Sequence, residues 1–371
     1  MRVGVPKEVK VRENRVGLTP ASVRELVHHG HAVVVEHDAG HGIGAGDDAY
    51  AREGASIAPD AAAVYGSCDM IVKVKEPQPA ERAMLRAGQV LFTYLHLAPD
   101  PEQTRDLVAS NSVCIGYETV TSASGGLPLL APMSEVAGRL AVQAGARYLE
   151  EPNGGKGILL GGVPGVPAAS VAVIGGGVVG THAIEIALGM GARVTVLDKS
   201  VEVLSRLWTH YGAPLTTVYA TAEAIERHVA AADLVIGAVL IAGAEAPKLV
   251  TRAMIREMQA GSVVVDVAID QGGCFATSHP TTHEAPTYLV DGVVHYCVAN
   301  MPGAVPRTST YALNDATLPF VLAIADKGWK RALADDVHLR RGLNVALGKV
   351  TCEPVARAQS YVYTDAAALL G

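Results

Sequence analysis

The stretch that decides the fold is Val171-Ala172-Val173-Ile174-Gly175-Gly176-Gly177-Val178-Val179-Gly180. Its apolar start predicts a buried strand, its glycines fit the pattern G-x-G-x-x-G, and the residues that follow predict a helix that ends at Gly191. A second strand-like run then leads to Asp198. The glycine pattern alone would be a weak signal, but in this context it predicts a βαβ unit that binds a dinucleotide.

Each part of this motif has a mechanical role. Gly175 is expected to make the tight turn, Gly177 to let the backbone approach a pyrophosphate, and Gly180 to let helix and strand pack closely. The N–H groups at the start of the helix suit phosphate oxygens. Asp198 can accept hydrogen bonds from ribose hydroxyls and would repel a 2′-phosphate, so NAD is expected rather than NADP, although Lys199 beside it weakens that preference. A glycine turn with a purely structural role is the alternative.

Strand-like runs alternate with helical stretches on both sides of the motif. This alternation is typical of βαβ units and parallel sheets. The fold class predicted is α/β, with two doubly wound Rossmann-like domains and an interdomain cleft. The other predicted strands are Arg2–Val5, Ala32–Glu36, Met70–Val74, Val90–Leu95, Val113–Tyr117, Arg193–Leu197, Thr216–Tyr219, Leu234–Ile236, Ser262–Val265 and Val293–Val298.

Two breaks in the alternation predict the domain boundaries. Glycines and prolines interrupt the pattern at residues 125–132 and again at residues 300–306, and after Arg307 the sequence predicts helices without further strands. We therefore expect an NAD-binding domain, 129–306, inserted into a discontinuous substrate domain of residues 1–128 and 307–371. Thr19 with Pro20, and separately Ser134, are predicted to begin helices.

The composition limits the classes of function. The chain has 371 residues, 49% hydrophobic and 18% charged, and a formal net charge of −7, which excludes intrinsic disorder. This acidic balance, without a Lys/Arg cluster, argues against nucleic acid and anionic membrane as partners. The charge-free run 157–184 contains prolines and glycines that argue against a membrane span. Five cysteines without a C-x-x-C pair, and the lack of an apolar signal core, predict a cytoplasmic setting, and we predict no metal site.

Four ionisable residues follow predicted strands, where ligands bind in parallel sheets. Lys75, His96 and Asp270 come directly after three strand-like runs, and Arg15 lies in the loop after the first. Each also has an ordinary structural explanation: a hydrogen-bonded histidine, an exposed ion pair between Lys75 and Glu76, a solvated loop, or a turn closed by Asp270. The spacing favours a site but does not prove one.

At these residues the sequence resembles the alanine dehydrogenase/transhydrogenase family. The resemblance extends over nearly the whole chain, and its separate segments follow one another in the family's order. The segments that carry it are residues 1–8, 14–20, 74–77, 92–97, 131–139, the glycine loop, 246–250, 266–273 and 300–302.

The resemblance implies reversible, NAD-dependent oxidative deamination of L-alanine to pyruvate and ammonia. It implies that Arg15 and Lys75 bind the substrate, that His96 is the acid/base, and that Asp270 acts at the reacting carbon, stabilising an iminium and orienting water or ammonia. It also implies a two-domain protomer that assembles into hexamers. The NAD contacts it implies are Ser134, Val178, Val179, Asp198, Val239, Leu240, Val267, Asp270, Val298, Asn300 and Met301.

The sequence departs from the family on the cofactor side. Val203 stands where Lys or Arg is common, Ala220 where serine is common, and His279 where arginine is common, which puts the strength of NAD binding in doubt. Three alternatives stay open: a transhydrogenase component, which would need a membrane partner, a hydroxy-acid dehydrogenase, and a catalytically silent NAD-sensing protein.

Overall fold

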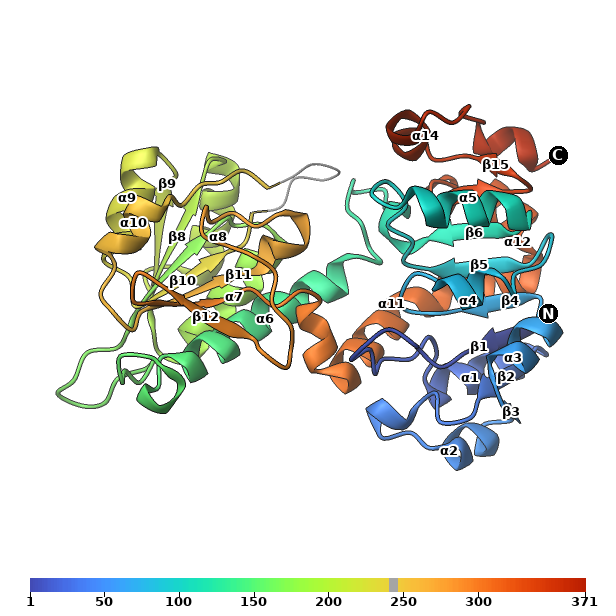
Figure 1. The fold of residues 1–371 in the computed structure, drawn as a ribbon, viewed down its shortest axis with the longest axis horizontal. Coiled ribbons are helices and arrows are strands. Elements are labelled where there is room, and N and C mark those ends of the chain that lie inside the picture. Colours follow the sequence, from blue (N-terminus) through green and yellow to red (C-terminus); the bar gives the residue numbers. More distant parts are fainter. Residues whose placement is uncertain (240–245) are drawn as a thin grey trace. The chain divides into compact units, whose positions relative to one another are not determined.

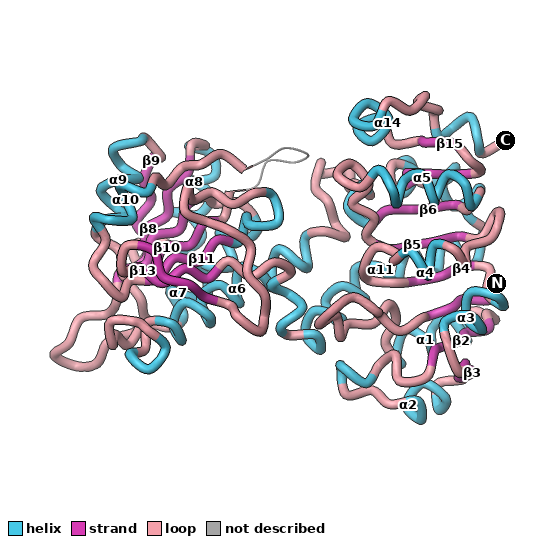
Figure 2. The backbone as a smooth tube through the Cα atoms, viewed as in Figure 1, coloured by secondary structure: helices cyan, strands magenta, loops and turns pink. Residues whose placement is uncertain are grey.

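The computed structural model describes residues 1–239 and 246–371. The chain divides into two compact units, of which the first comprises Met1–Met133 with Val305–Gly371 and the second comprises Ser134–Ala304. Each unit contains its own sheet with helices on both faces (Figure 1; strands in magenta in Figure 2). The predicted α/β fold with two parallel-sheet domains is confirmed.

Six parallel strands form most of the sheet in the first unit, in the order β3-β2-β1-β4-β5-β6. The strand order therefore reverses direction between β1 and β4, which makes the sheet doubly wound. Two short strands from near the end of the chain extend the sheet beyond β6, where β14 pairs antiparallel with β6 and β15 with β14. The strands are β1 (Arg2–Val5), β2 (Ala32–Glu36), β3 (Ser56–Ala58), β4 (Met70–Val72), β5 (Val90–Thr93), β6 (Val113–Gly116), β14 (Leu343–Ala346) and β15 (Lys349–Val350).

Helices cover both faces of this sheet. Thr19 caps α1, its hydroxyl accepting a hydrogen bond from the Ser22 N–H, and Pro20 is the first helical residue, as predicted. The helices are α1 (Pro20–His28), α2 (Asp47–Arg52), α3 (Ala61–Ser67), α4 (Pro79–Arg82), α5 (Pro101–Ser110), α11 (Pro306–Lys327), α12 (Trp329–Asp335), α13 (Val337–Arg340) and α14 (Glu353–Gln359), with single turns η1 (His41–Ile43), η2 (Tyr117–Thr119) and η6 (Ala366–Leu369).

The sheet of the second unit repeats this topology in the order β9-β8-β7-β10-β11-β13, with β12 antiparallel at the edge. Its direction reverses between β7 and β10. The strands are β7 (Ser170–Ile174), β8 (Arg193–Asp198), β9 (Leu215–Tyr219), β10 (Leu234–Gly237), β11 (Val263–Asp266), β12 (Thr287–Val290) and β13 (Val293–Tyr296). The helices are α7 (Val178–Gly189), α8 (Val201–Tyr211), α9 (Ala222–Ala230) and α10 (Arg252–Glu257), with turns η3 (Glu151–Asn153), η4 (Val267–Gln271) and η5 (Met301–Ala304).

Two local predictions are wrong. The segment after Arg307 does contain strands, β14 and β15. The sequence did not indicate β14 because the polar Asn344 interrupts its apolar run. The side chain of Asn344 fits this buried strand because it donates hydrogen bonds to the Thr119 hydroxyl and the Gly342 carbonyl. Ser134 does not cap its helix, since α6 (Ala131–Tyr148) begins three residues earlier. Pro132 suits the first turn of a helix, where its missing N–H costs nothing, and it starts α6 before Ser134.

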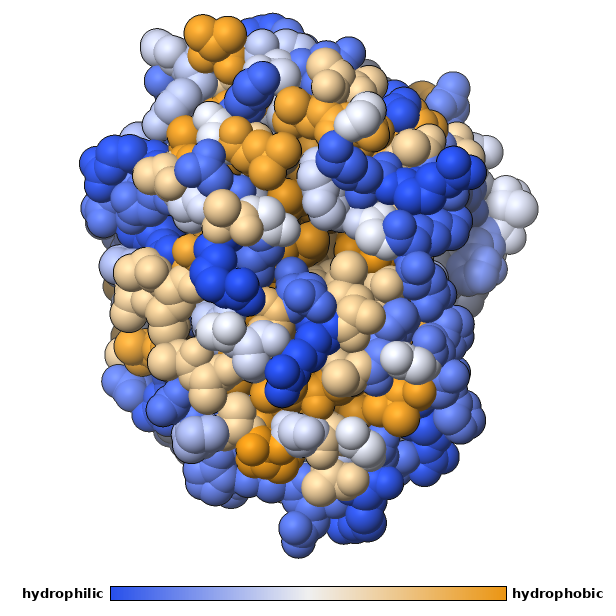
Figure 3. Space-filling model, turned by 90° about the vertical axis from the view of Figure 1, so that its right-hand side faces the viewer, coloured by the Kyte–Doolittle hydropathy of each residue, from blue (hydrophilic) through white to orange (hydrophobic). Residues whose placement is uncertain are grey.

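Each sheet is buried in its own apolar core. In the first unit the core includes Val34, Ile71, Leu91 and Val345, and in the second it includes Ile174, Val235 and Val264. On the face shown in Figure 3 apolar side chains are interspersed with hydrophilic ones. Among the described residues, no helix is both long and apolar enough to cross a membrane.

Candidate active site and dinucleotide site

Arg15, Lys75 and His96 come from three segments that leave the same edge of the first sheet. Arg15 lies between β1 and α1, Lys75 follows β4, and His96 follows β5. These strands are parallel neighbours in the order β5-β4-β1, so their carboxyl ends meet at one edge. The edge includes the point between β1 and β4 at which the strand order reverses, which is where doubly wound sheets bind ligands.

Arg15 is buried and held by a carboxylate. Its Nε and Nη2 donate to the two oxygens of Glu13 at 2.7 and 2.6 Å, and its Nη1 lies 3.1 Å from the sulfur of Met133. Burial alone would lower the pKa of the guanidinium, but the hydrogen bonds and charge of Glu13 outweigh it, so the pKa lies above its usual value. Arg15 is therefore a permanent, oriented cation.

Lys75 is a partly buried cation of a different kind. Among the described residues, none gives its ammonium a hydrogen bond or an ion pair, although Glu76 beside it pairs with Lys10. Burial lowers the pKa of Lys75, and the nearby charge of Arg15 lowers it further. Two neighbouring cations that are not both neutralised attract an anionic ligand such as a carboxylate.

A buried ion cluster fixes the backbone that carries Lys75. The ammonium of Lys73 lies 3.1 Å from Glu8 and 2.6 Å from Glu81, and the side chains of all three are almost fully buried. The other Glu8 oxygen accepts from the N–H groups of Val74 at 2.7 Å and Lys75 at 3.3 Å. Because Glu8 follows β1 and Lys75 follows β4, this contact joins the two loops across the reversal point.

His96 is exposed and has an unusual backbone conformation. Its φ is +49°, its N–H donates to Glu118 at 2.6 Å, and its ring stacks on Tyr94 with centroids 5.7 Å apart. Tyr94 is itself fixed, because its buried hydroxyl donates to the carbonyl of Leu129 at 2.5 Å. A histidine held in the left-handed region by a carboxylate is strained, and strain of this kind is concentrated at functional sites.

Asp270 lies in the second unit, in the turn η4 directly after β11, and its side chain is exposed. The turn is organised by its buried neighbour Asp266, which accepts hydrogen bonds from the Ser278 hydroxyl at 2.6 Å and from the N–H groups of Ala268 and Cys274 at 3.1 and 2.9 Å. Burial raises the pKa of Asp266. Asp266 therefore shapes the loop, and Asp270 presents its carboxylate from it.

The glycine loop between β7 and α7 has the features expected for a pyrophosphate. Gly175 has a φ of +100°, and a side chain on Gly180 would meet the Gly175 carbonyl oxygen at 1.8 Å. Within the described part of the chain, a side chain on Gly177 would instead meet open space, and no side chain caps the N-terminus of α7. The first N–H groups of α7 thus border open space, so these residues fit the diphosphate of NAD.

Asp198 ends β8 next to this loop. Its two oxygens accept from the N–H groups of Gly176 at 2.7 Å and Ser200 at 2.8 Å. A carboxylate has about four acceptor positions, so further positions can accept ribose hydroxyls. Val203 packs towards Gly176, and His279 stacks on Tyr288 at 3.7 Å between ring centroids.

The other predicted NAD contacts lie at the ends of strands or helices in the second unit, and Leu240 lies outside the described residues. Val178 is exposed, whereas Val298 and Met301 are almost fully buried. Asn300 has a φ of +58°. Of the remaining four, Val179 in α7 is buried, and the other three are partly buried, Ser134 within α6, Val239 after β10 and Val267 in η4. Ala220 is buried after β9.

Sequence reasoning missed the acidic partners of the predicted cations and loops. These are Glu8, Glu13, Glu118 and Asp266, each of which accepts hydrogen bonds within a loop that carries a predicted site residue. Their only signal was a carboxylate close in sequence to a strand end. Among the described residues, His37, Asp38 and Asp47 could in principle hold a metal ion, but they lie at the surface and hydrogen-bond to one another.

The comparisons with known proteins agree on one family. The family model "Alanine dehydrogenase/PNT, N-terminal domain" matches residues 4–137, and "Alanine dehydrogenase/PNT, C-terminal domain" matches residues 141–353. An alanine dehydrogenase of Halomonas elongata is 59% identical over 371 residues, which is the full length of both chains.

Solved structures give the same result. A structure of an L-alanine dehydrogenase superposes with a TM-score of 0.94 at 52% identity and covers 96% of this chain and 99% of its own. A transhydrogenase from Sinorhizobium meliloti is more distant, with a TM-score of 0.82 at 25% identity over 95% of this chain and 99% of its own. Since both family models and full-length relatives match, the chain belongs to the alanine dehydrogenase/PNT family.

Proposed function

We propose that this protein catalyses the reversible, NAD-dependent oxidative deamination of L-alanine, in which L-alanine, NAD⁺ and water give pyruvate, ammonium, NADH and a proton. The observation that carries the proposal is that Arg15, Lys75 and His96 follow three neighbouring strands at the same edge of the first sheet, beside its reversal point. In the proposed division of labour, residues 1–128 and 307–371 bind the substrate and residues 129–306 bind NAD.

Arg15 binds the substrate carboxylate, because Glu13 holds its permanently charged guanidinium in a fixed orientation. Lys75 polarises the oxygen that becomes the carbonyl oxygen of pyruvate. Because the Lys75 ammonium is partly buried, little water screens its charge, and this strengthens the interaction. Both residues contact the part of the substrate that L-alanine and pyruvate share, so they serve both directions of the reaction.

His96 moves protons to and from the oxygen of the carbinolamine, since an imidazole ring can both accept and donate a proton. Asp270, on the second unit, stabilises the positive charge of the iminium and orients the water or ammonia that attacks it. NAD, when bound, supplies the acceptor for the hydride that leaves the α-carbon. The residues that hold it are those of the glycine loop, Asp198 and the neighbouring strand ends.

The discriminating experiment titrates ammonium from zero at fixed NADH and pyruvate. We expect NADH oxidation to depend on ammonium and alanine to accumulate, with a rate that rises above neutral pH because only unprotonated ammonia attacks. An ammonium-independent rate with lactate as product would instead support a hydroxy-acid dehydrogenase, which needs no anion beside an iminium. NADH binding without any turnover would support a silent NAD-sensing protein.

The proposal extends to a homohexamer that works in the cytoplasm. The hexamer is proposed from family membership, since the chain matches alanine dehydrogenases over their full length. Light scattering after size-exclusion chromatography measures the mass in solution, and a mass other than six chains would overturn the hexamer without affecting the reaction.

A further inference from the structure

Gly176, within the glycine loop, is held from two sides by groups of opposite charge. Its N–H donates to Oδ2 of Asp198 at 2.7 Å, and its carbonyl oxygen accepts from Nη2 of Arg206 at 3.1 Å. The hydroxyl of Thr181 also lies 3.3 Å from the same carbonyl oxygen. The carboxylate expected to bind the ribose and the guanidinium of Arg206 are thus linked through a single loop residue.

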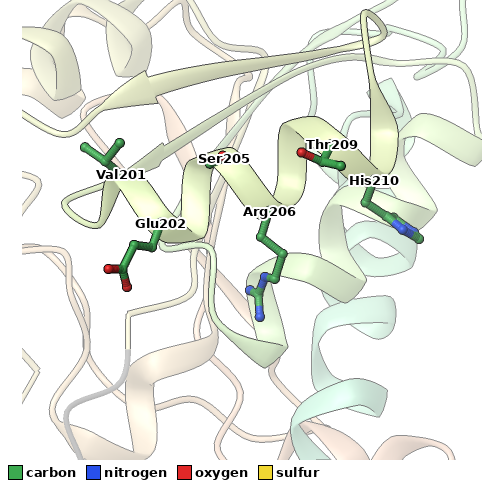
Figure 4. A pocket seen from close by; sticks show the side chains of 6 residues that line it. All are labelled: Val201, Glu202, Ser205, Arg206, Thr209 and His210. Atoms are coloured by element: carbon green, nitrogen blue, oxygen red, sulfur yellow. The ribbon is translucent and has the colours of Figure 1, made fainter.

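Helix α8 brings Arg206 to this position. Ser200 caps the helix by accepting from the Val203 N–H at 3.2 Å, and the helix then lies so close to the loop that a side chain on Gly176 would meet Val203 at 2.6 Å and Leu207 at 2.8 Å. Arg206 follows Val203 by three residues and therefore lies on nearly the same face of the helix. In Figure 4 its side chain projects away from Ser205 and Thr209, on the side of the helix that also bears Glu202.

The guanidinium is accessible to a ligand. Arg206 is an exposed residue, and it lines an open hollow along α8 together with Val201, Glu202, Ser205, Thr209 and His210 (Figure 4). Among the described residues, its one hydrogen bond is to Gly176, which leaves most of its five N–H donors available. Lys199, the other cation next to Asp198, has no hydrogen bond within the described part of the chain.

We propose that Arg206 positions the glycine loop for the dinucleotide and also sets how strongly the protein rejects NADP. The proposal rests on NAD binding, which is part of the proposed function, and adds a residue to it. Arg206 donates a hydrogen bond to the Gly176 carbonyl and so stabilises the same loop conformation that Asp198 stabilises. The loop therefore loses less conformational entropy when NADH binds. As a cation close to Asp198, it offsets part of the repulsion that the carboxylate exerts on a 2′-phosphate.

These two effects predict different responses for the two cofactors. Arg206→Gln should weaken NADH binding by about 10-fold, the size expected for losing one charge-assisted hydrogen bond. It should weaken NADPH binding more, because the offsetting cation is also lost. Asp198→Ala should strengthen NADPH binding only while Arg206 is present, so the double variant Asp198→Ala/Arg206→Gln should lose that gain.

The experiment measures dissociation constants for NADH and NADPH by fluorescence titration, which requires no turnover. The proteins are the unaltered chain, Arg206→Gln, Arg206→Lys, the Asp198→Ala single and double variants, and two controls. Lys199→Gln removes the other cation near Asp198, and Arg227→Gln removes an exposed arginine of α9 that pairs with Glu223 instead of the loop. Thermal unfolding checks that each variant is folded.

Arg206→Lys separates the two roles, because lysine keeps the charge but loses the planar fork; it should retain more NADPH affinity than Arg206→Gln. Unchanged NADH and NADPH affinities in Arg206→Gln would overturn the proposal while leaving NAD binding intact. An equal loss of NADH affinity in Lys199→Gln, or of either affinity in Arg227→Gln, would also overturn it, since the effect would then follow total charge. Absence of NADH binding by the unaltered chain would instead refute the proposed function itself.

Discussion

Glu13 accepts two hydrogen bonds from one edge of the Arg15 guanidinium, at 2.7 Å from Nε and 2.6 Å from Nη2. Both side chains are almost fully buried. The pair leaves Arg15 no rotational freedom, and the opposite terminal nitrogen, Nη1, lies against Met133. We therefore expect Glu13 to set the direction in which Arg15 meets a substrate carboxylate. Substrate affinity should depend on Glu13 although Glu13 itself repels an anion.

Glu13→Gln should raise KM for pyruvate by about 10-fold, because the neutral amide holds Arg15 with weaker hydrogen bonds. If Glu13 acted only by repelling the substrate, KM would fall instead, so the sign of the change decides between the two roles. Arg15→Lys should lower kcat/KM by about 100-fold, since an ammonium cannot bind a carboxylate through two parallel hydrogen bonds. NADH affinity, measured by fluorescence, should stay unchanged in both variants.

Lys75 should cause kcat/KM for pyruvate to decrease at alkaline pH, which we call the alkaline limb of the pH profile. Burial and the charge of Arg15 lower its pKa, so its ammonium loses the proton at a lower pH than that of an ordinary lysine. Since the protonated form polarises the substrate oxygen, kcat/KM for pyruvate should fall as pH rises through this lowered pKa. The profile is measured at saturating NADH and at a fixed concentration of free ammonia.

Lys75→Arg removes this titration, because guanidinium stays protonated throughout. The variant should be slower overall, with its alkaline limb moved to higher pH or absent. If the alkaline limb stays at the same pH in Lys75→Arg, another group must cause it. Lys75→Ala should reduce kcat and raise KM together, as expected for a residue that binds both substrate and transition state.

The buried cluster of Glu8, Lys73 and Glu81 permits a matched comparison. Both carboxylates pair with Lys73, but Glu8 alone accepts from the Lys75 N–H, whereas Glu81 accepts from the N–H of Gln78. Glu8→Ala should raise KM for pyruvate by about 10-fold, and Glu8→Gln, which keeps an acceptor, should raise it less. Glu81→Gln should lower the melting temperature without that change in KM. Equal KM changes in Glu8→Ala and Glu81→Gln would show that the cluster contributes stability alone.

The central strands were predictable because a strand buried on both faces of a parallel sheet is a continuous apolar run. β4, for example, is Met70-Ile71-Val72, and all three residues are buried. The strands that were missed are short or lie at the edges. β3 has three residues and only Ala58 is buried, while β12 has none that is fully buried, so neither has the hydrophobic signal of a central strand.

The site was predictable to the extent that strand ends determine it. Sequence order places Arg15, Lys75 and His96 after strands, and the topology then brings those strands together. Pairing partners were not predictable in this way, because Lys73 and Glu8 are 65 positions apart and meet only in the folded sheet. The left-handed backbone of His96 likewise has a partner that only the fold brings near, because its N–H donates to a carboxylate 22 positions away.

Gly180 gives a test of the dinucleotide site that is independent of the substrate. A methyl group there would lie 1.8 Å from the Gly175 carbonyl oxygen, so Gly180→Ala must push the loop away from the start of α7. We expect NADH affinity to fall by at least 10-fold. Gly189→Ala is the matched control, because a side chain at that position of the same helix meets no described residue within 4 Å.

His96 provides the sharpest test of the proposed chemistry. His96→Ala should lower kcat by about 100-fold or more, the usual contribution of a general acid/base, while NADH binding to the glycine loop stays near normal. Alanine is poorly suited to the φ of +49°, so a displaced loop would add to the loss in this variant.

His96→Asn removes that ambiguity, because asparagine adopts the left-handed conformation readily and cannot transfer protons near neutral pH. The two variants should therefore lose activity to a similar extent. Glu118→Gln weakens the support of the Leu95 and His96 N–H groups but keeps the imidazole, so it should lose much less activity. Near-normal turnover in His96→Asn would show that the imidazole is not the acid/base and that the strained backbone at this position serves another purpose.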